Sequence, residues 1–226
     1  IFGSEKKIFR SNSLVIEIDG PIQIIKVAGM GPYDNNGYII ADPSTKEAYI
    51  IDAPAQINLL IEAASDYKLK AALITHSHPD HIAGYNELKE TTNIPVGIHQ
   101  NDADRLPMQP EFFLEHGMKL KIGSLQFNVL HTPGHTPGGL CFTSDHFIIS
   151  GDTLFPGGPG MTRSGENFRE IVHSITNQLF KLPDNAVVFP GHGINTDIGK
   201  ARAEYEVFKN TPHPEGLFGT IRWDQS

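Results

Sequence analysis

Short apolar runs fill the first quarter of the chain, and Gly, Pro, Asp and Asn residues separate them. Runs rich in Ile, Val and Tyr that are bounded by such turn residues predict β-strands. These strands are expected at residues 13–18, 22–27, 37–41 and 48–51. Apolar residues then follow at positions 57, 60, 61 and 64, a spacing that predicts a helix over residues 56–67.

The remaining sequence alternates between apolar runs and amphipathic stretches. Strands are predicted at residues 70–74, 94–99, 120–122, 125–130, 139–143, 147–150 and 186–189. Helices are predicted over about 82–90, 102–106, 166–180 and 196–210. Two series of strands with helices between them predict a layered α/β domain. We expect one domain over residues 1–226, with its core at about 13–210. The irregular tail at 211–226 is expected to dock on this body or on a neighbouring subunit.

Composition narrows the class of protein. Hydrophobic residues make up 39% and charged residues 19% of the chain, as in an ordinary globular protein. The net charge of -8 argues against a nucleic-acid partner or an anionic membrane surface. No apolar run approaches the ~20 residues that a membrane span needs.

The first residues and the cysteine count bear on location. Residues 1–7 show no secretory apolar segment, although the chain does not begin with Met and export therefore stays open. Cys141 is the single cysteine, which excludes an internal disulfide and fits a reducing compartment. We expect a cytoplasmic protein with Cys141 in its core.

Residues 75–84 read T-H-S-H-P-D-H-I-A-G and carry the strongest chemical signal. His76, His78, Asp80 and His81 fall within six positions. Imidazole and carboxylate groups are the ligands that suit zinc, iron and manganese. The segment therefore predicts a metal site, or two sites that share one turn.

Further candidate ligands lie later in the chain. They are His135 in T-P-G-H-T-P-G-G, Asp152 in S-G-D-T-L-F and His192 in F-P-G-H-G. Each follows a predicted strand in a turn rich in Gly and Pro, and loops at strand ends are where a scaffold presents functional side chains. Glycines there let the backbone turn sharply and approach an ion closely.

These four segments, in this order, resemble the metallo-β-lactamase superfamily. The likeness is greatest to its glyoxalase II group, the hydroxyacylglutathione hydrolases, in their short single-domain form, and it runs over roughly residues 20–208. The resemblance implies a four-layer αββα sandwich, with two mixed β-sheets flanked by helices and a metal site at one edge.

The resemblance also implies two divalent metal ions, zinc foremost, with iron or manganese as alternatives. The implied ligands are His76, His78 and His135 for the first ion and Asp80, His81 and His192 for the second, with Asp152 and a hydroxide bridging them. Such a hydroxide attacks a carbonyl carbon, and a thioester is a natural substrate because a thiolate leaves readily. Asp80 is in addition the candidate catalytic residue that orients the nucleophile or accepts its proton.

Four other residues are candidates for supporting roles. Asp52 is expected either to accept a hydrogen bond from a ligand imidazole or to cap a helix, and His131 to support the site or the strand end. Tyr33 in the loop 28–36 and Arg163 in the loop 156–163 are candidate substrate contacts, Arg163 for a substrate carboxylate. Both loops read equally well as plain surface connections.

Several functions stay open at this stage. We expect no counterpart of the C-terminal helical domain of full-length glyoxalase II enzymes, and the Gly-Cys-Gly-Arg pattern of that group does not follow Asp152. The acyl and thiol groups of the substrate therefore stay open. One alternative is a persulfide dioxygenase, with a single iron on His76, His135 and Asp152. Lactonase, β-lactamase and phosphodiesterase activities occur on the same fold, and a non-catalytic metal-holding protein is a third class. The oligomeric state is open, a homodimer included.

Overall fold

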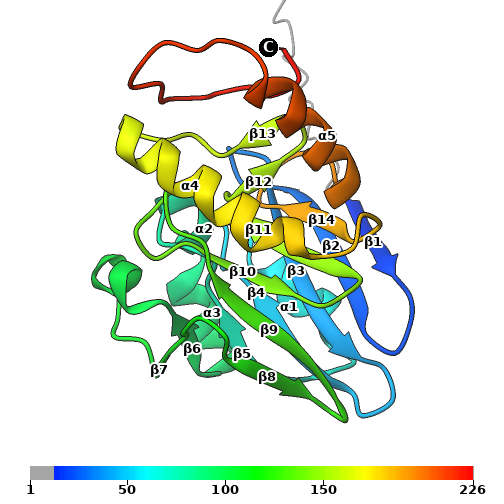
Figure 1. The fold of residues 1–226 in the computed structure, drawn as a ribbon. Coiled ribbons are helices and arrows are strands. Elements are labelled where there is room, and N and C mark those ends of the chain that lie inside the picture. Colours follow the sequence, from blue (N-terminus) through cyan, green and yellow to red (C-terminus); the bar gives the residue numbers. More distant parts are fainter. Residues whose placement is uncertain (1–12, 226) are drawn as a thin grey trace, which may run out of the picture.

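Two β-sheets lie face to face in the computed structural model, which describes residues 13–225 (Figure 1). The first sheet has seven strands in sequence order, antiparallel from β1 to β4 and parallel from β4 to β7. Its strands are β1 (Ser13–Ile18), β2 (Gln23–Met30), β3 (Asn35–Asp42), β4 (Glu47–Ile51), β5 (Lys68–Leu73), β6 (Val96–Ile98) and β7 (Phe112–Phe113).

The second sheet has six strands in the order β15-β14-β11-β10-β9-β8. Only β11 and β14 pair in parallel within it. The strands are β8 (Lys119–Ile122), β9 (Leu125–His131), β10 (Leu140–Thr143), β11 (Phe147–Gly151), β14 (Val187–Pro190) and β15 (Thr196–Asp197). A separate small hairpin joins β12 (Leu154–Phe155) to β13 (Gly158–Pro159).

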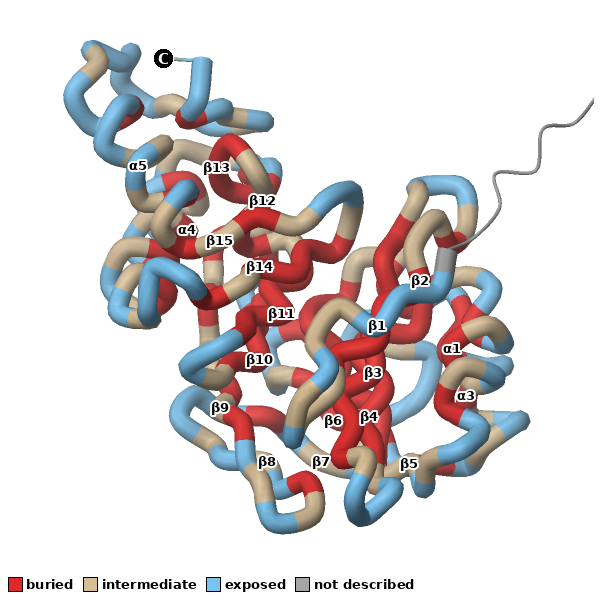
Figure 2. Tube along the Cα trace, turned by 90° about the vertical axis from the view of Figure 1, so that its right-hand side faces the viewer, coloured by how far each residue is buried: buried red, intermediate tan, exposed pale blue. Residues whose placement is uncertain are grey.

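Helices cover both outer faces, and Figure 2 shows the four layers side by side. The helices α1 (Asn58–Ala63) and α3 (Tyr85–Thr92) cover the first sheet, and α4 (Gly165–Asn177) and α5 (Ile198–Lys209) cover the second. Shorter elements are α2 (Pro79–Ile82), η1 (Gln100–Arg105) and η2 (Leu179–Lys181). The predicted αββα sandwich of two mixed sheets is therefore confirmed.

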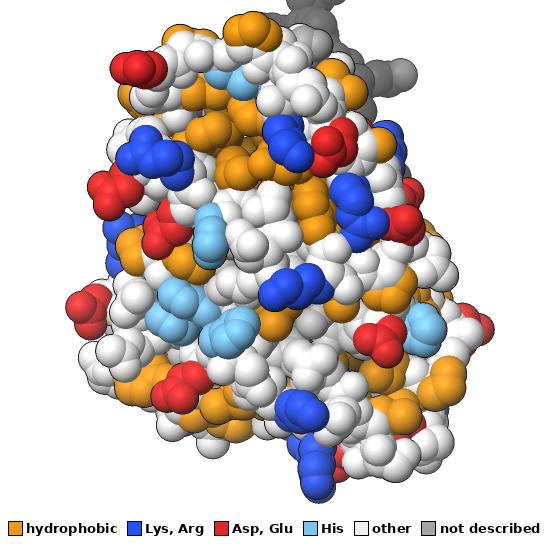
Figure 3. Space-filling model, viewed as in Figure 1, with side chains coloured by type: hydrophobic (Ala, Val, Ile, Leu, Met, Phe, Trp, Pro, Cys, Tyr) orange, Lys and Arg blue, Asp and Glu red, His pale blue; other side chains and the backbone are white. Residues whose placement is uncertain are grey.

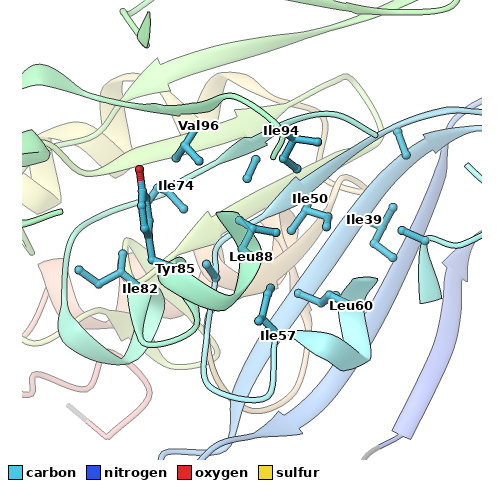
Figure 4. Close-up of a cluster of buried hydrophobic side chains, with 14 of the residues drawn as sticks. Ile39, Ile50, Ile57, Leu60, Ile74, Ile82, Tyr85, Leu88, Ile94 and Val96 are labelled. Atoms are coloured by element: carbon cyan, nitrogen blue, oxygen red, sulfur yellow. The ribbon is translucent and has the colours of Figure 1, made fainter. Parts of the chain in front are cut away.

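Three apolar layers hold the sandwich together, and β3 shows how the sequence builds them. Successive strand residues point to opposite faces, so Ile39 packs under α1 and α3 while Tyr38 and Ile40 pack between the sheets. Figure 4 shows the outer cluster, in which Leu60 and Leu88 from the helices meet strand residues such as Ile39. Because β3 is buried on both faces, it reads as a continuous apolar run rather than an alternating one.

The tail beyond α5 packs on the body of the same chain. Trp223 is fully buried in the third apolar cluster, where its ring contacts those of Tyr205 and Phe208. Its backbone N–H donates to the carbonyl of Gly157 at 2.7 Å. Figure 3 shows hydrophobic side chains gathered on this part of the surface, between α4 and the C-terminal segment. The tail was expected to dock on the body or on a neighbouring subunit, and in the structure it packs on the body.

Two predicted helices are wrong in extent, for reasons of backbone geometry. The helix predicted over 56–67 is shorter, because Gln56 has a left-handed φ of 65° and helical residues begin only at Asn58. The helix predicted over 82–90 is divided into α2 and α3 at Gly84. A Cβ atom at Gly84 would lie 2.4 Å from the carbonyl oxygen of Pro54, so this close approach requires glycine.

Other differences concern short elements. Residues 196 and 197 form β15, and α5 starts after Asp197, whose side chain accepts a hydrogen bond from the Lys200 N–H at 2.7 Å. The helix predicted over 166–180 ends at Asn177 and is followed by η2. The strand β7 and the β12–β13 hairpin were not predicted, since two-residue strands carry no periodic signal.

The expectations about location concern the first residues, membrane-spanning helices and Cys141. Residues 1–12, at the start of which no secretory segment was found, lie outside the described residues. Within residues 13–225 no helix has the length and apolar character needed to cross a membrane. Cys141 is fully buried, and burial raises the pKa of its thiol to about 11, as expected of a core residue.

Candidate metal centre

The predicted ligands come together at one end of the sandwich. They are carried by the loops that follow β5, β9, β11 and β14, and each loop begins where a buried strand stops. Three overlapping groups of His and Asp side chains have ligand atoms within 4.8 Å of one another. The groups are His76, His78 and His135; His76, His81 and Asp152; and Asp80, His81 and His192.

The first group consists of three imidazoles. His78 Nδ1 lies 3.1 Å from His76 Nε2 and 2.8 Å from His135 Nε2. Zinc–nitrogen bonds of 2.0–2.1 Å in a tetrahedral site imply ligand separations of about 3.3 Å. The nitrogens therefore stand close to where one ion would hold them.

The second group joins two imidazoles and a carboxylate. His192 Nε2 lies 3.4 Å from His81 Nε2 and 3.2 Å from Asp80 Oδ2. His81 Nε2 lies 3.5 Å from the same oxygen of Asp80. These separations also suit the coordination of a single cation.

Asp152 lies between the two groups. Its Oδ2 is 3.4 Å from His135 Nε2, and its Oδ1 is 3.4 Å from His81 Nε2. The Oδ1 atom is buried and has no hydrogen-bond partner among the described residues. A buried carboxylate oxygen without a donor is costly, and a cation on each side would satisfy it. The donor set and this orphaned oxygen both fit divalent metal ions.

Hydrogen bonds outside the centre fix the orientation of four of the imidazoles. In each, Nδ1 donates to an oxygen, so that Nε2 presents its lone pair to the interior. The acceptors are Thr75 Oγ1 for His76 (3.1 Å), Asp52 Oδ2 for His81 (2.8 Å), the Met161 carbonyl for His135 (2.7 Å) and the Tyr33 carbonyl for His192 (3.0 Å). A set of inward lone pairs with no proton between them is what a metal site requires.

Asp52 joins the ligand loop to the end of β4. Besides His81 it accepts hydrogen bonds from both the backbone N–H and the hydroxyl of Thr75, at 2.7 and 2.8 Å. It is buried and has a left-handed φ of 62°. Of the two roles expected for Asp52, the contact with a candidate ligand imidazole is the one present.

The ionisable side chains of the centre shift one another's pKa values. Burial alone would raise the pKa of Asp152, but His81, His76 and His135 outweigh it and hold the carboxyl well below its usual range. Burial and neighbouring imidazoles lower the pKa of His78 to about 4, and they lower that of His76 as well. The centre therefore offers ionised carboxylates and neutral imidazoles, the protonation states that bind metal.

Two imidazoles behave differently in the absence of a cation. Burial opposes protonation of His81, yet the carboxylates of Asp152 and Asp52 raise its pKa well above the ordinary value. The pKa of His192 is also raised, since the hydrogen bond with Asp80 outweighs the effect of burial. Metal ions bound here would displace these protons.

Three residues that no motif indicated also support the centre. Asn35 donates to Asp80 Oδ2 at 2.8 Å. Asp102 is buried and accepts from the N–H groups of Ser77 (2.9 Å) and Gly138 (2.8 Å), which ties two ligand loops together. Lys26 donates to the carbonyl of Gly193, next to His192, at 3.0 Å. The Asn35–Asn36 pair lies in a loop already singled out, but Lys26 and Asp102 carry no local sequence signal.

The other predicted residues lie around the centre rather than in it. The Tyr33 side chain is 68% exposed, and its carbonyl is the part that reaches His192. The His131 ring stacks on His99, and its Nε2 donates to the carbonyl of Pro137 at 2.9 Å, in the loop that carries His135. Arg163 is exposed and does not line the cavity described next.

A cavity of about 530 Å³ opens beside the candidate ligands. His135, Asp152 and His192 form its inner end. Its remaining lining comes from residues 155–161, 193–194 and 220–222, and includes Arg222. The centre is therefore accessible to a small molecule rather than closed.

Comparison with known proteins assigns the chain to a family. The family model of the metallo-β-lactamase superfamily matches residues 30–192. A hydroxyacylglutathione hydrolase from Haemophilus influenzae, GloC, is 31% identical over 80% of this chain and 94% of its own length. A protein of Aquifex aeolicus with no described activity is 33% identical over 80% of this chain and 94% of its own. The chain belongs to the metallo-β-lactamase superfamily.

Solved structures agree with this assignment. BLEG-1, a B3 metallo-β-lactamase, has a TM-score of 0.70 and 29% identity, covering 76% of this chain and 93% of its own. ETHE1 from Myxococcus xanthus has a TM-score of 0.64 and 27% identity, covering 84% of this chain and 80% of its own. TTHA1623, solved in a di-iron-bound form, has a TM-score of 0.63 and 28% identity, covering 76% of this chain and 94% of its own.

Proposed function

We propose that this protein is a metal-dependent hydrolase that cleaves a thioester of the hydroxyacylglutathione type and uses two metal ions. The observation that carries the proposal is Asp152, which lies between two groups of inward-facing nitrogen and oxygen atoms and has a buried oxygen without a donor. His76, His78 and His135 would hold one ion, Asp80, His81 and His192 the other, and Asp152 would bridge them.

Divalent ions at this place would supply an activated water and polarise the carbonyl of the substrate. The side chains of the protein have separate tasks. Asp80 would orient the attacking water, since its carboxyl is ionised and the Asn35 amide fixes its orientation. The cavity beside Asp152 binds the substrate next to these groups.

Relatives support the same class of chemistry. GloC is a hydroxyacylglutathione hydrolase, and TTHA1623 was solved with two irons. Zinc is the ion that His and Asp ligands favour most often in hydrolases, with iron or manganese as alternatives. The substrate is a small molecule, and the single buried cysteine fits an enzyme of the cytoplasm.

A dioxygenase with one iron is the competing function. His76, His135 and Asp152 line one small hollow, and ETHE1 shares the fold. However, His78 Nδ1 lies only 2.8 Å from His135 Nε2 and extends this set to a full hydrolase-type group. The separate group around Asp80 would have no role with a single iron.

The test compares metal-loaded and chelator-stripped protein on several substrates. We expect about two ions per chain and loss of thioester absorbance with S-lactoylglutathione, faster than turnover of a homoserine lactone, a β-lactam or a bis-aryl phosphate. Oxygen uptake with glutathione persulfide, at one iron per chain, would establish the competing function. Full loading with metal but no turnover of any of these substrates would favour a metal-holding protein.

A further inference from the structure

The outer wall of the cavity is formed by two segments that carry no candidate ligand. One is the β12–β13 hairpin with the residues that follow it, up to Met161. The other is the C-terminal segment at residues 220–222, which lies beyond the part of the chain that matches the family model. The hairpin lies within the matched part, so only residues 220–222 add to the region shared with the family.

Hydrogen bonds and an aromatic anchor hold the C-terminal segment in place. Thr162 and Gly219 exchange two backbone hydrogen bonds, at 3.1 and 3.0 Å. Trp223 is fully buried and packs on Tyr205, with ring centroids 4.9 Å apart. Because both ends of the segment are fixed to the body, residues 220–222 form a stable side of the cavity.

Glycines in the hairpin let the segment come close. Gly157 and Gly158 have left-handed φ angles of 83° and 134°. A Cβ atom at Gly157 would lie 2.3 Å from the Arg222 guanidinium, and one at Gly158 would lie 3.0 Å from the carbonyl oxygen of Ile221. Glycine is favoured at both positions by the left-handed φ, and at Gly158 also by the nearby Ile221 carbonyl.

The wall is apolar. The apolar residues that line it are Phe155, Pro156, Pro159, Met161, Ile194 and Ile221. Met161 and Ile194 are 42% and 75% exposed, and exposed apolar side chains at the rim of a site mark a ligand surface.

The one guanidinium of the wall is already paired with a carboxylate. Arg222 Nε donates to Asp224 Oδ1 at 2.9 Å, and its Nη2 contacts the other oxygen of Asp224. The outer wall thus presents no excess positive charge to offset the carboxylates of glutathione or the phosphates of a nucleotide thiol. Burying such a group without a partner is costly, so a charged thiol portion would stay in solvent.

We infer that the cavity binds an uncharged, apolar acyl group of a thioester, and that Ile221 is a specificity residue that limits its length. The inference rests on the proposed function, because the candidate metal centre places the scissile carbonyl at the inner end of the cavity. It refines the substrate class from hydroxyacyl thioesters in general to those with an apolar acyl chain.

The experiment uses one thiol and a series of acyl groups from acetyl to octanoyl, with succinyl as the charged counterpart of butanoyl. We expect kcat/KM to rise about fourfold per methylene until the cavity is filled, and succinyl to be hydrolysed more slowly than butanoyl. Ile221→Ala should move the optimum to longer chains and Ile221→Trp to shorter ones. Val207→Ala, at an exposed position on α5, is the matched control and should leave the optimum unchanged.

Binding of the corresponding thioethers, which cannot be hydrolysed, tests the cavity independently of turnover. The single tryptophan, Trp223, adjoins the wall at Gly158 and provides a fluorescence signal. We expect the Kd of the thioethers to fall with chain length. A Kd independent of chain length, or Ile221 variants that behave like Val207→Ala, would overturn the inference and leave the proposed function intact. Thioethers that bind by length while no thioester is cleaved would remove the proposed function instead.

Melting temperatures guard against misfolding of the variants. Ile221→Ala and Ile221→Trp should melt close to the parent protein, since Ile221 lies at the edge of the third apolar cluster. If Ile221→Trp unfolds, the lengthened optimum of Ile221→Ala still decides the matter, because loss of a methyl-rich side chain enlarges the cavity without strain.

Discussion

The two sides of the cavity are built by different kinds of interaction. The inner side consists of imidazoles and carboxylates whose positions depend on hydrogen bonds, such as those that Asp52 accepts from His81 and Thr75. The outer side depends on apolar packing around Trp223 and on glycines that permit close approach. Hydrogen-bond networks fix the orientation of each polar side chain. Apolar packing fixes the shape of a surface and tolerates replacement of one side chain by another of similar volume.

The residues expected to carry the reaction are therefore separate from those expected to select the substrate. The family model ends at His192, the last candidate ligand, and the C-terminal segment follows it. Changes on the inner side should therefore affect metal content and kcat, and changes on the outer side should affect stability and substrate preference.

Removal of His81 should have the largest effect on activity. His81→Ala takes one ligand from the Asp80 group and leaves Asp152 and Asp52 without their shared imidazole. We expect loss of the second metal ion and a fall in kcat on the order of 10³-fold, because both ions act on the same reacting carbonyl. Metal analysis and steady-state kinetics measure the two effects.

His146→Ala is the control for removal of an imidazole, since His146 is exposed and belongs to none of the candidate groups. It should leave both metal content and kcat unchanged. A His81→Ala protein that keeps one ion and full hydrolytic activity would contradict the need for two ions, and oxygen uptake with glutathione persulfide would then decide for the dioxygenase.

Trp223→Ala tests the outer side and should mainly affect stability. Truncation of a fully buried indole is expected to lower the free energy of unfolding by about 3–5 kcal/mol. Urea denaturation measures this loss, with Phe218→Ala as the exposed control at about 0.5 kcal/mol or less. The folded fraction should still bind the same number of metal ions. Loss of metal in the folded protein would show that the two sides are not separate.

Asp52→Asn should weaken metal binding without removing a ligand. The substitution keeps size and tolerates the left-handed φ of 62°, but an amide cannot accept all the hydrogen bonds that Asp52 receives from Thr75 and His81. We expect a decrease in metal affinity of about 10- to 100-fold, measured by competition with a chelator. Asp42→Asn, the same change at a buried turn between β3 and β4, should leave the affinity unchanged.

Asp102→Asn should have the smallest effect of the four. One of its two acceptor oxygens becomes an amide NH₂, so either Ser77 or Gly138 would face a donor instead of an acceptor. We expect the unfolding free energy to fall by about 1 kcal/mol, together with a modest loss of metal affinity because two candidate ligand loops lose their tie. Equal stability of the variant and the parent would mean that Asp102 does not clamp these loops.

The sequence was informative where local residue patterns decide structure. The layered fold follows from two series of apolar runs, and the candidate ligands lie in short Gly- and Pro-rich segments after strands, so the fold and the clustering of these side chains could be predicted. Asp102 could not, because its partners Ser77 and Gly138 are 25 and 36 residues away and are backbone groups that any residue offers. The loop 156–163 was expected either to contact the substrate or to be a plain surface connection, and residues 156–161 line the cavity. The C-terminal part of the wall, residues 220–222, could not be predicted, since its position depends on the packing of the tail.

Arg163 illustrates the same limit. An arginine just beyond Asp152 looked suited to a substrate carboxylate, yet the chain turns away before it, and Arg222 from the far end of the sequence lies in the cavity wall. Tertiary packing decides which distant residue lies in the cavity wall. Arg222 lies there because Trp223, the next residue, is buried.

The most direct test of the central claim is an anomalous difference map from crystals of the metal-loaded protein. We expect two peaks, one among His76, His78 and His135 and one among Asp80, His81 and His192, each within bonding distance of Asp152. A single peak confined to the first group, or no peak at saturating metal, would contradict it.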